Sequence, residues 1–151
     1  CTGNICRSPM AAALFSAQLA RRAAAAGHEW TVVSAGTWAA HGLPAAPHAL
    51  AVMAAKGIDL TPHRSRILTE ASLNAADLVL VMTASHREAI LAEFPSAAGK
   101  VYLLSQMTGQ TFDIHDPYGE TKTEYDYRAE ELQGLIEAGF ERIVKLAGGA
   151  T

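Results

Sequence analysis

The feature that most constrains the fold of this sequence is a pair of apolar, strand-like segments separated by one helical segment. Residues 77–82 (DLVLVM) have the near-continuous hydrophobic character of a strand that is buried on both faces. Residues 85–94 follow with the composition of a helix that Pro95 ends, and residues 101–104 (VYLL) resemble a second strand. A strand, a helix and a strand in this order predict two parallel strands joined by a right-handed crossover.

The rest of the chain extends the same alternation. Residues 30–33 (WTVV) predict a third strand. Further helices are predicted to begin at Ser8–Pro9 and to span residues 47–56, 69–73 and 124–146. We therefore expect a single α/β domain over residues 1–151, a three-layer fold with a parallel sheet flanked by helices. Ligands of such folds bind beyond the carboxyl ends of the strands.

Composition excludes several classes of protein. The chain has 151 residues, of which 50% are hydrophobic and 18% charged, and its formal net charge is -3. These values exclude an intrinsically disordered chain and do not fit a nucleic-acid-binding protein. No apolar run approaches the roughly 20 residues that cross a bilayer, so we expect no membrane contact. Two cysteines, Cys1 and Cys6, are too few and too close for a secreted disulfide framework.

Residues 1–9 (CTGNICRSP) carry the clearest chemical signal. A cysteine, five residues and an arginine lead directly into a helix that Ser8 is expected to cap and Pro9 to begin. The loop backbone can turn its N–H groups inward at the helix N-terminus and bind an anion, and Gly3 supplies the backbone freedom for this turn. Arg7 adds a planar fork that matches two phosphate oxygens.

The same positive field favours a thiolate at Cys1. A helix N-terminus and a nearby cation lower a thiol pKa from about 8.5 to between about 3.5 and 7.5. A thiolate beneath a bound phosphate can attack phosphorus in line and form a phosphocysteine, and Ser8 can donate a hydrogen bond to the sulfur when it leaves. Cys1 and Cys6 have no second pair of ligands at metal-binding spacing, so we expect neither a metal nor a cofactor.

The loop from Cys1 to Pro9 resembles the signature of the low-molecular-weight protein-tyrosine phosphatase family, and the resemblance extends over essentially the whole chain. It implies a four-stranded parallel sheet, a phosphate-binding loop at residues 1–8, Cys1 as the nucleophile and Arg7 as the phosphate clamp. The substrate-binding residues that it implies are Thr2, Gly3, Asn4, Ile5, Cys6, Ser8 and Tyr118. The polar network that it implies beneath the loop consists of Asn4, Ser8, Ser34 and His63.

A second loop is expected to supply an acid. Residues 106–123, the acid loop, are rich in Gly, Thr and Asp, and such long loops are usually functional. The Asp-Pro-Tyr sequence that begins at Asp116 matches the family's Asp-Pro-aromatic signature. Asp116 is therefore predicted to protonate the leaving oxygen and then to activate water, while Tyr118 forms one wall of the substrate cleft. Asp113 and His115 are expected to be solvated loop residues.

Ile5 bears most directly on substrate choice. It resembles the apolar residue of the tyrosine-specific members, which packs against a phenyl ring, whereas the related protein-arginine phosphatases usually have Thr there. Two features resemble the arginine-specific branch instead: Gly119 directly after the aromatic residue, and Thr83 where many tyrosine-specific enzymes carry Asp. Because Ile5 lies in the loop that holds the substrate, we expect protein phosphotyrosine as the substrate, with protein phosphoarginine as the alternative.

Two other functions compete with this hypothesis. A thiol-dependent arsenate reductase needs relay cysteines, and residues 7–151 contain none. A non-catalytic phosphate-binding module needs neither the thiol of Cys1 nor the carboxyl group of Asp116, so their joint presence favours an enzyme. A protective disulfide between Cys1 and Cys6 under oxidation is a regulatory hypothesis.

The reactive thiol also indicates the setting. It fits a reducing cytoplasm, where phosphorylated proteins would be the partners and inorganic phosphate or a similar oxyanion would occupy the loop of a monomer or weak dimer. The family's nucleophile follows directly after a buried strand. We therefore expect an apolar strand of about five to seven residues, the usual length, before Cys1.

Asp116→Asn should cause a large loss of turnover on an alkyl or phenyl phosphate while substrate binding is retained, because asparagine cannot donate a proton to the leaving oxygen. Steady-state rates across the pH profile measure this effect. Wild-type rates from the variant at every pH would contradict the assignment of Asp116.

Overall fold

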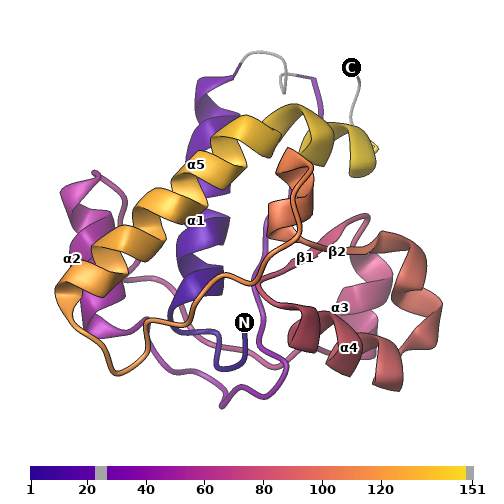
Figure 1. Cartoon of the computed structure of the whole chain (residues 1–151), viewed down its shortest axis with the longest axis horizontal. Helices are drawn as coiled ribbons and strands as arrows, with labels where there is room; N and C mark the ends of the chain where they lie inside the picture. The colour runs from indigo at the N-terminus through magenta and orange to yellow at the C-terminus, as the bar shows by residue number, and fades with distance from the viewer. Residues whose placement is uncertain (23–26, 149–151) are drawn as a thin grey trace.

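A computed structural model of the chain describes residues 1–22 and 27–148. The elements in chain order are α1 (Arg7–Arg21), α2 (Pro47–Ala55), α3 (Glu70–Ala75), β1 (Val79–Val81), α4 (Ala84–Glu93), the 3-10 helix η2 (Pro95–Lys100), β2 (Val101–Leu103), the 3-10 helix η3 (Leu104–Thr108) and α5 (Lys122–Leu146). Figure 1 shows the strands between two groups of helices, with α1, α2 and α5 on one side and α3 and α4 on the other.

The two strands form a parallel sheet that is covered on both faces. β1 and β2 pair in register, with Val79 opposite Val101 and Val81 opposite Leu103. Alternate side chains of a strand point to opposite faces. The side chains that pack on the core around α1 and α5 are Leu78, Leu80 and Tyr102. Those that join a second cluster with α3 and α4 are Val79, Val81, Val101 and Leu103. The predicted buried strands and their parallel pairing are confirmed.

The strand predicted at residues 30–33 is wrong for the described part of the chain. Residues 29–35 have no ladder partner there, and the nearest pairing is a single parallel bridge between Gly36 and Ile67. An extended segment becomes a strand only through hydrogen bonds to a neighbour, and β1 and β2 pair with each other. The sheet of the described residues thus has two strands, fewer than the sequence pattern predicted and fewer than the four that the resemblance implied.

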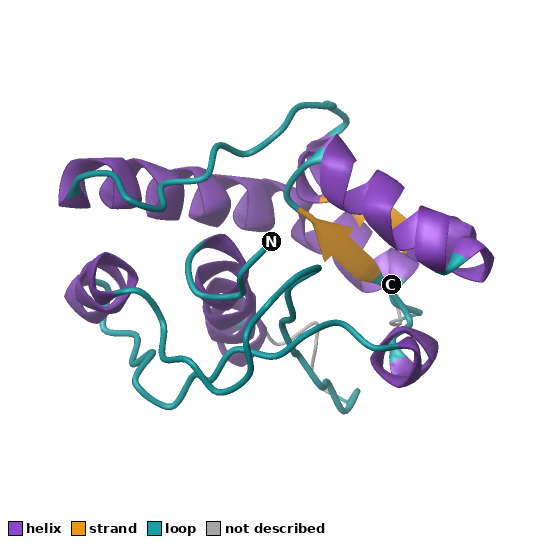
Figure 2. Cartoon of the chain, turned by 90° about the horizontal axis from the view of Figure 1, so that it is seen from below, coloured by secondary structure: helices purple, strands orange, loops and turns teal. Residues whose placement is uncertain are grey.

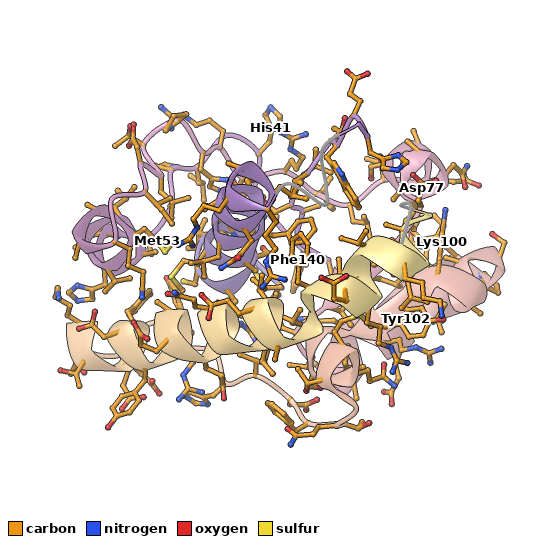
Figure 3. The ribbon with its side chains drawn as sticks, turned by 90° about the horizontal axis from the view of Figure 1, so that it is seen from above. His41, Met53, Asp77, Lys100, Tyr102 and Phe140 are labelled. Carbon is orange, nitrogen blue, oxygen red and sulfur yellow. The ribbon has the colours of Figure 1, made fainter. Side chains whose placement is uncertain are left out.

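The predicted helices form close to their expected positions. The side chains of Thr69, Thr83 and Thr121 accept hydrogen bonds from backbone N–H groups at the starts of α3, α4 and α5. Figure 3 shows Phe140 where α5 faces α1, and Met53 between α2 and α1. Among the described helices, none combines the length and the apolar character needed to cross a membrane.

The carboxyl end of β1 gathers the segments of the predicted site. The residue after β1, Met82, accepts a hydrogen bond through its carbonyl oxygen from the backbone N–H of Ile114 in the acid loop, at 2.9 Å. The side chain of Thr2 in the phosphate-binding loop lies 3.0 Å from His86 on α4. In Figure 2 the start of the chain, marked N, lies near the tip of a strand arrow. Both predicted loops therefore meet where this class of sheet binds its ligands.

Gly139→Ala should destabilise the fold, because a Cβ at this position on α5 would lie 2.6 Å from the Cβ of Met107 on η3. Overpacking of this kind costs about 1–3 kcal/mol. The matched control is Gly134→Ala in the same helix, where an added Cβ meets no atom within 4 Å. This control should stabilise the protein by roughly 0.5–1 kcal/mol, because alanine is the better helix former. Urea unfolding measures both effects, and equal stabilities of the two variants would contradict the packing argument.

Candidate active site

Asn4 is the centre of the phosphate-binding loop. It is fully buried, and its φ of 57° lies in the left-handed region that asparagine tolerates better than most residues. Its Nδ2 donates to Ser8 Oγ at 2.9 Å and to Ser34 Oγ at 3.0 Å, and its Oδ1 accepts from the Arg66 N–H at 3.0 Å. His63 Nε2 lies 2.7 Å from its carbonyl oxygen. These bonds tie the loop to two distant segments.

Asn4, and not Gly3, supplies the unusual backbone angle of the loop. The prediction that assigned this task to Gly3 is wrong, because Gly3 is not among the residues with positive φ. The conformational cost at Asn4 is offset by its side-chain bonds, which a glycine could not make. The sequence pattern alone favoured glycine because glycine adopts such angles without a partner.

Ser8 lies beside the predicted nucleophile. Its Oγ is 2.8 Å from Cys1 Sγ. Because Asn4 Nδ2 donates to the same hydroxyl oxygen, the hydroxyl proton is free to point at the sulfur. The prediction that Ser8 caps the first helix is wrong, since α1 already begins at Arg7 and has no side-chain cap bond. The hydroxyl is engaged in the loop instead.

A second segment fixes the start of the loop through its backbone. The N–H groups of Thr37 and Trp38 donate to the carbonyl oxygens of Cys1 and Thr2, each at 3.1 Å. Gly36 is required beside them, because a Cβ there would lie 2.3 Å from the Thr2 carbonyl oxygen. The phosphate-binding loop is therefore held from outside before any substrate contacts it.

Arg7 joins the phosphate-binding loop to the acid loop. Its side chain is 4% exposed, its Nη1 donates to the Ile114 carbonyl oxygen at 2.7 Å, and its Nη2 lies 3.3 Å from Asp116 Oδ2. Its Nε has no partner among the described residues. Burial lowers the pKa of Arg7, and the neighbouring Asp116 opposes this shift. A guanidinium edge with a free Nε–H is the kind of planar fork that can bind two oxygens of a phosphate.

Asp116 reaches Arg7 from a loop that is anchored by a buried residue on either side of it. Ile114 and Pro117 are fully buried, whereas the Asp116 side chain is 47% exposed. Asp116 Oδ1 accepts the N–H of Tyr118 at 3.1 Å, which orients the carboxyl group. Tyr118 is exposed, as a wall of an open cleft would be.

Cys6 belongs to the core rather than to the open side of the loop. It is buried and lies 3.2 Å from the hydroxyl of Tyr125 on α5. Burial raises its pKa, although the bond to Tyr125 acts in the opposite direction. Cys1 and Cys6 are both free thiols. Cys6 would therefore serve substrate binding, as the resemblance implied, through its backbone and not its sulfur.

Two residues of the site were missed by sequence reasoning. His86 is buried on α4, and its Nε2 lies 3.0 Å from Thr2 Oγ1. Asp113 is exposed, as expected of a solvated loop residue, and its Oδ1 also accepts the backbone N–H of Ala84 at 2.8 Å, a contact that was not predicted. Neither partner is near in sequence, so no local pattern could have found these contacts.

Comparisons with known proteins agree on one family. The family model described as low molecular weight phosphotyrosine protein phosphatase matches residues 1–146. A probable low molecular weight protein-tyrosine-phosphatase, EpsP of Ralstonia nicotianae, is 40% identical over 143 residues, which is 95% of this chain and 92% of that protein.

Solved structures of similar proteins have the same fold. The YwlE arginine phosphatase from Geobacillus stearothermophilus matches with a TM-score of 0.85 and 40% identity, over 96% of this chain and 90% of that chain. A low molecular weight protein tyrosine phosphatase from T. tengcongensis matches with a TM-score of 0.86 and 40% identity, over 94% of this chain and 95% of that chain.

His86 should make the stability depend on pH. Burial lowers its pKa from 6.5 to about 4. Between these values the unfolded chain binds a proton that the folded chain does not, so the free energy of unfolding should fall as the pH decreases from 6.5 towards 4. One such proton changes it by at most about 1.4 kcal/mol per pH unit. Urea unfolding of the wild type and His86→Gln should show a shallower slope in the variant. Identical pH slopes of the free energy of unfolding in the two proteins would contradict the assignment of a lowered pKa to His86.

Proposed function

Since this chain belongs to the low molecular weight phosphotyrosine protein phosphatase family, we propose that it hydrolyses phosphotyrosine on proteins through a phosphocysteine on Cys1. The observation that carries the proposal is the meeting of the two loops. Ser8 Oγ lies 2.8 Å from Cys1 Sγ in one loop, and Asp116 Oδ2 of the other loop lies 3.3 Å from Arg7 Nη2. The nucleophile and the phosphate clamp thus come from one loop, and the acid comes from another that lies more than a hundred residues further along the chain.

In the first step the Cys1 thiolate attacks phosphorus while the Arg7 fork holds two of the phosphate oxygens. The sulfur–phosphorus bond forms as the bond from phosphorus to the tyrosine oxygen breaks. Asp116, protonated at this stage, gives its proton to that oxygen, so that tyrosine leaves as a neutral phenol.

In the second step a water molecule attacks the phosphocysteine. The Asp116 carboxylate accepts the proton of the water, phosphorus bonds to the new oxygen, and the bond to sulfur breaks. The sulfur leaves as a thiolate, which the Ser8 hydroxyl stabilises from 2.8 Å. Inorganic phosphate is released, and Asp116 is again protonated for the next cycle.

Local structure weakens the argument for phosphoarginine. The Thr83 hydroxyl accepts the His86 N–H at 3.1 Å and so caps α4. Gly119 has a φ of 78°, which explains a glycine after the aromatic residue. Both residues therefore have roles in the local fold that do not depend on the substrate. Ile5 remains, half-buried beside the core, with an apolar side chain suited to a phenyl ring.

Overall similarity does not separate the two substrates. A relative named as a tyrosine phosphatase and one named as an arginine phosphatase share the same identity, 40%, with this chain. The substrate therefore depends on the residues around the loop, and Ile5 favours phosphotyrosine.

The chemistry also indicates the setting of the enzyme. Cys1 must be a free thiol to act, and both cysteines of the chain are free. A reducing compartment preserves this state, so the cytoplasm is the proposed location. There the enzyme would act on phosphorylated proteins as a monomer or weak dimer, with an oxyanion such as phosphate as the ligand of the loop.

Phosphate release from phosphotyrosine and phosphoarginine, measured side by side, tests the substrate. We expect kcat/KM to be higher for phosphotyrosine by about tenfold or more, and Ile5→Thr to reduce this preference by about tenfold, because a hydroxyl replaces apolar surface against the ring. Ile5→Val is the matched control, which keeps the apolar surface and should keep the preference.

A wild type that is faster on phosphoarginine would overturn the phosphotyrosine assignment. Turnover of neither compound, together with tight phosphate binding, would instead indicate a non-catalytic phosphate-binding module.

A further inference from the structure

Residues 113 and 114 attach the acid loop to the rest of the site. The backbone N–H of Ile114 donates to Met82 O at 2.9 Å, and the backbone carbonyl of Ile114 accepts from Arg7 Nη1 at 2.7 Å. The remaining contact uses a side chain, since the backbone N–H of Ala84 donates to Asp113 Oδ1 at 2.8 Å. The two backbone bonds of Ile114 need no particular side chain, although the Ile114 side chain is itself buried in the core, whereas the bond to Ala84 needs an acceptor side chain at position 113.

The bond from Asp113 links two segments and is not the only cap of its helix. Thr83, the N-cap residue of α4, already accepts the N–H of His86 from within the same turn. Asp113 lies 29 residues beyond Ala84, the first residue of α4, and accepts its backbone N–H. A carboxylate is the favoured acceptor at a helix N-terminus, because its charge strengthens the bond and complements the helix dipole.

The same turn of α4 also contacts the phosphate-binding loop. His86 Nε2 lies 3.0 Å from Thr2 Oγ1, and Thr2 directly follows the nucleophile Cys1. The first turn of α4 is thus a common support for the nucleophile and for the acid loop. A site held on one rigid element keeps its groups in register better than a site on independent loops.

We propose that Asp113 is a positioning residue for Asp116, which it holds over the phosphate-binding loop by fastening the acid loop to α4. The inference rests on the proposed role of Asp116 as the general acid. The Asp116 side chain is 47% exposed and contacts Arg7 and the N–H of Tyr118, so its position follows the loop backbone. A displacement of about 1 Å in a catalytic group can reduce a rate by about a hundredfold.

Two substrates with different leaving groups separate positioning from folding. Phenolate leaves poorly and depends on a proton from the acid, whereas p-nitrophenolate leaves well without one. Asp113→Ala should lower kcat/KM by about tenfold for phenyl phosphate and by less than about threefold for p-nitrophenyl phosphate. A smaller fraction of folded enzyme would lower both values equally. Asp113→Asn keeps an acceptor oxygen and should restore most of the wild-type ratio.

Thr83→Ala is the matched control for helix capping. It removes the other N-terminal cap of α4 without touching the acid loop, so the ratio of the two kcat/KM values should equal that of the wild type. Asp116→Asn is the reference for full loss of the acid and should change the ratio most.

The outcomes distinguish this inference from the proposed function. If Asp116→Asn changes the ratio and Asp113→Ala does not, the positioning role is overturned and the general acid stands. If Thr83→Ala changes the ratio as much as Asp113→Ala does, helix capping explains the effect and the positioning role is likewise overturned. If Asp116→Asn leaves the ratio unchanged, the assignment of the acid is wrong and this inference fails with it.

Discussion

The burial of one guanidinium group is the constraint on which this site depends. A charged group removed from water is stable only when it is paired and hydrogen-bonded. Arg7, whose side chain is 4% exposed, meets this requirement with the carbonyl of Ile114 and the carboxylate of Asp116. Both partners lie in the acid loop, so the pairing of this buried cation brings the acid loop and the phosphate-binding loop together. The Nε of the same group has no partner among the described residues.

The fold supports that pairing from several sides. Side chains of β1 alternate between two hydrophobic clusters, which fixes the strand and the point at which it ends. The first turn of α4 follows directly and contacts both loops. His86 lies beside Thr2 of the phosphate-binding loop, and the backbone N–H of Ala84 donates to Asp113 of the acid loop. In the phosphate-binding loop Asn4 has a left-handed backbone conformation, and four hydrogen bonds hold it there. Rigid elements thus position the polar groups of the site.

Substrate choice rests on fewer atoms than the fold does. Relatives named for tyrosine and for arginine share the fold and the same identity with this chain. The residue types at Thr83 and Gly119 resemble the arginine-specific branch. In the structure Thr83 caps α4, and Gly119 adopts a positive φ in a turn. The substrate argument therefore rests on Ile5, an apolar residue of the phosphate-binding loop that is only half-buried.

The sequence by itself determined the features that depend on neighbours in the chain. Strands β1 and β2, the helices and the phosphate-binding loop follow from periodicity, caps and spacing, and the Asp-Pro-Tyr pattern indicated Asp116. Tertiary structure decided the rest. Among the described residues, 30–33 have no strand partner, and Asn4 rather than Gly3 has the left-handed backbone angle. Asp113 accepts a hydrogen bond from the backbone N–H of Ala84. Each outcome depends on hydrogen bonds to groups distant in sequence, and a local pattern carries no information about which distant groups the fold brings within reach.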